Sequence, residues 1–380
     1  MIALGTVGIR YLEAATLALL VVGVALVFVR KRPPGLVWFS AVAMTTIAAH
    51  LFVEEGRWQL VPAYALGFVL FFWLARPSAR PYRAPGLFVR VIVALVAVPT
   101  LLLPFAAPLF IVPPPAGPYR VGTASVLVDP AGTERLRVWY PASAGAATVA
   151  PFWSAADLAG ASLPGFPPLF ATHLTLVPTP ALHRAPVLER VLPLLLVLPD
   201  AESLPGDYLG LELQAASDGW LVVRVPGQPD EERVLRIVDA LSVPETDVAL
   251  AGRVCTDRLV VVVAGSTPVP GLGTPVLHVG GESVFAADLP GASFAVDYPD
   301  ARVPHPALTS RRLMAMPPSL LVGSSDVAPA RLDRALRHLF RVVLSDGSSA
   351  APVFSAELPA QQALLAGAEG ASIRMMPAGR

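Results

Sequence analysis

The sequence predicts a chain in two parts: four transmembrane helices, followed by an α/β domain with a mostly parallel sheet. Three observations lead to this prediction. Four long apolar stretches fill residues 1–112, a proline-rich segment follows, and beyond it short Val/Leu-rich strands alternate with helical patterns. Hydrophobic residues make up 54% of the chain and charged residues only 15%. That composition is too apolar for an ordinary soluble protein and indicates a membrane protein.

Each apolar stretch approaches or exceeds the roughly 20 residues that a helix needs to span about 30 Å of hydrocarbon. The stretches are Ala14–Val29 (extendable back to Ile9), Gly35–Val53, Trp58–Ala75 and Leu87–Val112. The proline-rich segment, residues 113–118, is typical of a stiff linker. We therefore expect a transmembrane region over residues 1–112 and an α/β domain over residues 119–380.

Positive charge predicts the orientation of these spans. One basic loop contains Arg30, Lys31 and Arg32, the other contains Arg76, Arg80 and Arg83, and the loop between spans two and three is Glu54-Glu55-Gly56-Arg57. The positive-inside rule places the two basic loops in the cytoplasm. We therefore expect a protein of a bacterial inner or plasma membrane whose C-terminal domain is extracytoplasmic.

Four ionisable residues, Arg10, Glu13, His50 and Arg90, lie within or beside the spans. Such residues are often functional, but Arg10, Glu13 and Arg90 are near enough to the interface to reach it or to pair locally, and His50 lies close to the outer end of its span. We expect structural roles for them. No repeated pattern of acids and bases indicates an ion path, so a transporter is the weaker alternative.

Beyond the linker, the alternation of strands and helices is typical of a sheet built from βαβ units. The expected strands are Ala124–Val128, Leu136–Tyr140, Val191–Leu198, Trp220–Val225, Leu259–Ala264, Ala292–Val296, Ser319–Val322 and Val342–Leu344. The expected helices are Tyr208–Ser217, Asp230–Leu241, Ala330–Phe340 and Ala360–Ala368. Residues 150–186 fit neither pattern, which leaves a lid, an apolar surface facing the membrane, or a packed irregular insertion.

The strand Leu259–Ala264 runs into a tight turn that carries Ser266. An α/β-hydrolase holds its nucleophile at such a turn, in the form Gly-x-Ser-x-Gly. Here Ala264 and Pro268 replace the two glycines. Proline is tolerated in the first turn of a helix, but Val-Pro-Gly-Leu-Gly follows, so we expect the next helix to be broken or absent. The alternative interpretation of Ser266 is a hydroxyl that ends a core strand.

A family resemblance extends over most of residues 117–355. Gly117-Pro-Tyr-Arg-Val-Gly122, followed by Arg137-Val-Trp-Tyr-Pro141, resembles the start of the hydrolase domain in platelet-activating-factor acetylhydrolase-like proteins, relatives of the dienelactone hydrolases. Asp218-Gly-Trp-Leu-Val-Val and Phe294-Ala-Val-Asp297 continue the register. The resemblance implies an α/β-hydrolase fold, and some bacterial members similarly place membrane spans before that domain.

The resemblance also implies positions for the catalytic acid and base. Asp297 stands at the family's acid position, Asp326 is an alternative acid after the next expected strand, and both positions also suit a turn or cap residue. The family's histidine follows a glycine after the last strand, but residues 344–354 contain none, and Ala350 or Ala351 stands there. Among the histidines that follow Ser266, which are His278, His305 and His338, we expect only His305 as a stand-in base.

The turn expected to supply oxyanion donors is altered as well. It is Pro199-Asp-Ala-Glu-Ser203, whose carboxylates would oppose the developing negative charge. The spacing of Asp200, Glu202, Asp297 and Asp326 matches no metal-binding loop, so we expect neither metal nor cofactor. Zero net charge without a basic cluster argues against nucleic-acid binding.

The sequence thus favours a membrane-anchored, extracytoplasmic α/β-hydrolase-like protein that no longer catalyses hydrolysis. Its expected role is binding, scaffolding or envelope assembly, with the lipid bilayer, a lipid or acyl ligand, or another membrane or envelope protein as partners. The competing hypothesis is an active serine esterase or lipase that acts on acyl esters of membrane lipids through Ser266, Asp297 and His305.

Overall fold

The computed structural model describes most of residues 2–264 and three short strands beyond them, at 276–279, 293–297 and 372–376. Within 2–264 the gaps are 5–6, 30–33, 77–85, 107–108, 111, 113, 129–133, 144, 146, 161–167, 200–204, 207, 228–229, 243–249 and 251. The chain divides into two compact units, which are described separately below. The first comprises Met1–Ile111, Ser154–Val177 and Leu313–Pro317, and the second comprises Val112–Trp153, Pro178–Arg312 and Pro318–Arg380.

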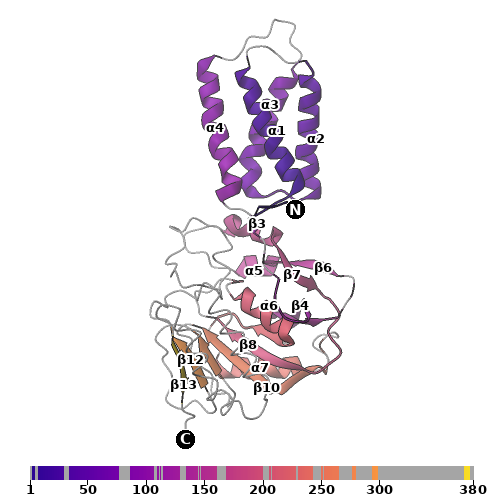
Figure 1. Ribbon diagram of the computed structural model, residues 1–380, viewed down its shortest axis with the longest axis vertical. Coiled ribbons are helices and arrows are strands. Elements are labelled where there is room, and N and C mark those ends of the chain that lie inside the picture. Colours follow the sequence, from indigo (N-terminus) through magenta and orange to yellow (C-terminus); the bar gives the residue numbers. More distant parts are fainter. Residues whose placement is uncertain are drawn as a thin grey trace. The chain divides into compact units, whose positions relative to one another are not determined.

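Four long apolar helices make up most of the first unit (Figure 1). They are α1 (Tyr11–Phe28), α2 (Leu36–Val53), α3 (Val61–Ala75) and α4 (Leu87–Ala106), with the short 3-10 helix η1 (Trp58–Leu60) before α3. All four are long and apolar enough to cross a membrane, so the predicted apolar helices are confirmed. The last helix ends at Ala106, whereas the predicted apolar stretch extends to Val112. Pro108 follows closely, and a proline disfavours helical backbone at the residue before it.

Close approach between these helices depends on glycine. A Cβ atom added at Gly23 of α1 would lie 2.7 Å from a ring carbon of Phe71 on α3, and one added at Gly67 would lie 3.0 Å from Ile47 on α2. Lipid tails are as apolar as leucine, so small residues and polar contacts, rather than burial from water, hold such helices together. The core between the helices is apolar and mostly aliphatic, with Phe71 as its buried aromatic residue.

Several short elements complete the first unit. A small antiparallel sheet joins β1 (Ile2–Leu4), β2 (Val7–Ile9) and β3 (Leu109–Phe110). Residues 150–186 fitted neither the strand nor the helix pattern in the sequence. Part of this stretch forms α5 (Ala155–Gly160) and the 3-10 helix η2 (Pro168–Leu176). Helix η2 packs against η1 and β3, and its His173 is buried. This stretch is therefore a packed insertion that belongs to the helical unit.

The second unit is built on a 10-stranded sheet in the order β13-β12-β11-β10-β8-β9-β5-β4-β7-β6. Its strands are β4 (Arg120–Leu127), β5 (Arg135–Ala142), β6 (Thr148–Pro151), β7 (Pro178–His183), β8 (Leu192–Leu198), β9 (Leu221–Arg224), β10 (Val254–Ala264), β11 (Val276–Val279), β12 (Ser293–Asp297) and β13 (Ser372–Met376). The central strands from β9 to β12 run parallel. Antiparallel pairs occur towards both edges, where β4 and β7 still pair in parallel, so the sheet is mixed with a parallel centre.

The antiparallel pairs follow from chain connections. A parallel pair needs a crossover of about a dozen residues. Only residues 128–134 separate β4 from β5, too few for such a crossover, and the two strands pair as an antiparallel hairpin. The expected strands up to residue 297 are confirmed, with ends shifted by up to five residues, whereas β6, β7, β11 and β13 had no counterpart. The strands and helices expected at 319–322, 330–340, 342–344 and 360–368 lie outside the described residues.

Both faces of the central sheet are covered. Leu194, Leu196 and Leu198 of β8 pack in one apolar cluster with Val234 and Ile237 of helix α7 (Glu231–Ser242). The intervening Leu195 and Val197 are also fully buried and point to the opposite face, since side chains alternate along a strand. Helix α6 (Leu209–Asp218) packs on β4, β5 and β9. A strand buried on both faces requires the continuous Val/Leu pattern that predicted it.

The end of the linker is fixed to helix α6. The Ala116 amide donates to Gln214 Oε1 at 2.9 Å, and Ser217 Oγ donates to the Tyr119 carbonyl at 2.8 Å. A Cβ atom at Gly117 would lie 2.5 Å from the Ser217 backbone. Only glycine therefore fits there, and the linker does not act as a free spacer over its last residues.

Candidate functional site

The carboxyl ends of β8 and β10 lie side by side in the centre of the sheet. Leu198, the last residue of β8, is the register partner of Val263, and β10 ends one residue later. From β8 the chain continues to β9 on one side, and it returns to β10 on the other side. In open α/β sheets, ligands bind outside the carboxyl ends of strands where the strand order reverses in this way. The topology therefore marks this edge as the candidate site of the second unit.

The predicted catalytic residues follow strands that end at this edge. Ser266 comes two residues after β10, and Asp297 is the last residue of β12. Register partners connect Ala264 to Val279 of β11 and Val279 to Val296 of β12, so the backbone of Asp297 reaches the same edge, two strands from β10. Ser266, His305 and Asp326 lie outside the described residues, as do Asp200, Glu202 and the alanines at 350 and 351.

The backbone of one histidine, His278, lies close to this edge, which the sequence did not predict. His278 lies in β11, where its backbone pairs with Val263 of β10 and with Ala295 of β12. The strand that holds it was not predicted, because Pro275 and several glycines precede only four strand residues. Its position next to β10 adds His278 to the histidines that a test of the site must include.

Aromatic residues support the turn that follows β8. The Trp153 indole donates a hydrogen bond to the Pro205 carbonyl. Gly206, whose φ is +94°, lies against the Phe152 ring, and a Cβ atom there would be 2.6 Å from that ring. Arg137 donates to the carbonyl of Phe152 at 2.9 Å. The two residues just before the insertion 154–177 therefore contact residues 205–206, which follow β8 in the chain.

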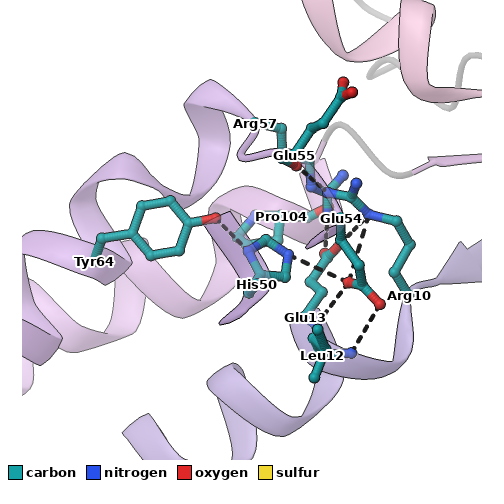
Figure 2. A network of polar contacts seen from close by, with 9 residues as sticks. All are labelled: Arg10, Leu12, Glu13, His50, Glu54, Glu55, Arg57, Tyr64 and Pro104. Atoms are coloured by element: carbon teal, nitrogen blue, oxygen red, sulfur yellow. Dashed lines mark hydrogen bonds and ion pairs between the residues drawn. The ribbon is translucent and has the colours of Figure 1, made fainter. Parts of the chain in front are cut away.

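The first unit contains a second candidate: a network of buried polar side chains at one end of the helices (Figure 2). It is formed where α1 begins, α2 ends and α3 begins. Its side chains are those of Arg10, Glu13, His50, Glu54, Arg57 and Tyr64.

Glu13 and Arg57 form the buried centre of this network. Arg57 Nη2 donates to Glu13 Oε1, and the same nitrogen lies 3.5 Å from the Pro104 carbonyl on α4. Their side chains are only 1% and 2% exposed. Burial lowers the pKa of the Arg57 guanidinium, and the Glu13 carboxylate opposes that shift. An arginine remains protonated under such conditions, so Glu13 is the counter-ion of a buried positive charge.

Glu54 caps the first turn of α1 from the neighbouring helix. Its Oε1 accepts from the Leu12 amide at 3.0 Å and its Oε2 from the Glu13 amide at 3.2 Å. The residue at the helix's own cap position, Arg10, makes no such side-chain bond and instead donates to the Glu55 carbonyl at 2.8 Å. A carboxylate at a helix N-terminus satisfies free amides and interacts favourably with the helix dipole.

His50 connects this network to α3. Its Nδ1 lies 2.8 Å from the Tyr64 hydroxyl, and its Nε2 lies 3.5 Å from Glu54 Oε2. The predicted local pairing of Arg10 with Glu13 is confirmed at 3.6 Å. The sequence did not indicate that Glu54, Arg57 and Tyr64 belong to this network. Glu54 and Arg57 lie in the loop between spans two and three, the one predicted loop that carries both acidic and basic residues. Arg90 is half-buried on α4 and is not among the residues of this network.

Comparisons with known proteins leave the family open. No family model and no curated protein matches the chain. Among solved structures, it is similar to a ferulic acid esterase from Streptomyces cinnamoneus, at 19% identity and a TM-score of 0.40, over 70% of this chain and 99% of that one. A likeness at this level assigns neither family nor activity, so the resemblance to platelet-activating-factor acetylhydrolase-like proteins stays a prediction.

Proposed function

We propose that this protein is a membrane-anchored, extracytoplasmic α/β-hydrolase-like protein that binds a lipid or acyl ligand without hydrolysing it. A role in scaffolding or envelope assembly follows if a second membrane or envelope protein also binds. The observation that carries the proposal is the missing base. The last histidine of the chain is His338, and residues 344–354, where the family resemblance requires the catalytic histidine, contain none. Loss of one triad member typically lowers the rate by about 10⁴–10⁶.

The connection between β10 and β11 supports the same conclusion. Residues 265–275 alone join these two parallel strands. Such crossovers take about a dozen residues when they include a helix. The short connection contains three prolines and three glycines, which disfavour helix. Its 11 residues are about the minimum for a crossover with a helix, so the composition is what argues against a helix whose N-terminus would face a nucleophile at Ser266.

A fluorophosphonate probe tests the catalytic part of the proposal, because it reacts covalently only with an activated serine. We expect the full chain in mild detergent to show no labelling that depends on Ser266. Labelling of the wild type but not of Ser266→Ala would establish the alternative, a serine esterase acting on acyl esters of membrane lipids. His278→Ala and His305→Ala would then identify its base, and Asp297→Asn and Asp326→Asn its acid.

A separate measurement tests the binding part. Native mass spectrometry of the protein extracted in mild detergent should show a bound lipid or a partner chain. A variant with a charge at the candidate edge, Ala264→Asp, should lose the lipid. A ligand-free monomer at every detergent concentration would contradict the binding role. The orientation is tested by a reporter fused after Arg380, which should be active only outside the cytoplasm.

A further inference from the structure

We propose that the polar network at the end of the helices contains a water-binding site lined by Arg10, Glu13, His50 and Glu54. The first argument comes from unmet hydrogen-bonding capacity. Arg10 Nε, Glu13 Oε2 and His50 Nε2 are buried and make no hydrogen bond to any group in the described part of the chain. Buried polar atoms in folded proteins almost always have a partner.

The second argument is that these atoms converge. Arg10 Nε lies 3.6 Å from Glu13 Oε2 and 3.9 Å from Glu54 Oε2. His50 Nε2 lies 3.5 Å from the same Glu54 oxygen. Figure 2 shows the side chains of Arg10 and His50 directed towards that carboxylate. Polar groups held at such distances, too long for good direct hydrogen bonds, are the arrangement that a bridging water satisfies.

The third argument concerns the chemistry of the occupant. Two arginines and two glutamates balance the charge of the network, so it does not call for an ion. Arg10 Nε offers a donor, and the two Oε2 atoms offer acceptors. When the Tyr64 hydroxyl donates to His50 Nδ1, His50 Nε2 carries the proton and becomes a second donor. A small neutral molecule that both donates and accepts matches this set, and a buried water with two to four polar partners does so.

The site also has a path to the surface. The side chains of Arg10 and Glu54 are 14% and 15% exposed, whereas His50 is fully buried. Water can therefore exchange past the first two and reach the third. Once it is occupied, a continuous hydrogen-bonded chain runs from Glu54 through water and His50 to Tyr64, inside an otherwise apolar helix bundle.

Hydroxyl-radical labelling in ¹⁸O-water tests this site on the full-length protein in detergent micelles. Radicals formed at a bound water oxidise the nearest ring, and fragmentation of the peptides assigns the oxidised residue. We expect His50 to incorporate several-fold more ¹⁸O than Phe71, because both rings are buried in the same bundle and only the imidazole faces the network. Equal labelling of the two rings, whether both high or both low, overturns the proposal.

A variant adds specificity to this test. Glu54→Leu removes the oxygen on which the lining atoms converge, and the labelling of His50 should fall to the level of Phe71. Persistence of the His50 label in a folded Glu54→Leu protein would also overturn the proposal. If that variant does not fold, the contrast between His50 and Phe71 in the wild type still decides.

Discussion

The ion pairs of the two units differ in burial. In the second unit the side chains of the pairs Glu134–Arg233 and Glu232–Arg236 are at least 27% exposed. In the first unit an apolar core ends in a network with two buried or nearly buried ion pairs. If the four helices cross a membrane, as we propose, lipid gives no hydrophobic drive between them, and they depend on close packing and polar contacts.

This comparison is tested most strongly by Glu13→Gln. The substitution leaves the Arg57 guanidinium buried without its counter-ion, and breaking a buried pair in this way costs roughly 3–5 kcal/mol. We expect the helical unit to unfold at lower SDS fraction in mixed micelles, followed by circular dichroism. The double variant Glu13→Gln, Arg57→Gln should recover most of the loss. A change below about 1 kcal/mol in the single variant would show that the pair does not hold the helices together.

Leu196→Ala tests the sheet unit. Its side chain is fully buried in the apolar cluster, and deletion of a buried leucine costs roughly 2–5 kcal/mol through lost burial and the resulting cavity. Urea denaturation followed by tryptophan fluorescence should show the loss, while the SDS transition of the helices should stay unchanged. Leu127→Ala is the matched control, since Leu127 is 36% exposed. If Leu196→Ala shifts both transitions, the two units do not unfold independently.

The smallest effect is expected at the helix cap. Glu54→Ala removes the acceptor of the Leu12 and Glu13 amides, which should cost roughly 0.5–2 kcal/mol, the range of helix caps. Hydrogen exchange at these two amides should accelerate. Glu55→Ala should leave exchange unchanged, because Glu55 contributes only its carbonyl to Arg10. Equal acceleration in both variants would attribute the effect to the loop rather than to the carboxylate.

The sequence was most informative where a single local pattern determines the element. Long apolar runs located the four helices, apart from the end of α4, and Val/Leu runs located β8 and β10. Both patterns are local, because they depend only on whether the surroundings of the segment are apolar. The short strands β6 and β11 have no such pattern. They depend on pairing with distant neighbours, which no local window contains.

The candidate sites show the same limit. Arg10 and Glu13 could be paired from their spacing on one helix, because residues three apart are neighbours. The contact of Arg57 with Glu13 joins residues 44 positions apart and depends on how the helices pack. For the sheet edge, the serine, acid and base positions rest on resemblance, and the structure adds the register that brings the ends of β10 and β12 to one edge.

The insertion at 154–177 has a practical consequence for anyone who wishes to isolate the second unit. The polypeptide passes between the units near residue 112 and again on each side of this insertion. Cleavage of the proline-rich linker would therefore not release the sheet from the four helices, because η2 would remain packed on η1 and β3. A fragment that begins at Tyr119 would carry the insertion without its packing partners. A short glycine bridge from Trp153 to Pro178 should make that fragment soluble.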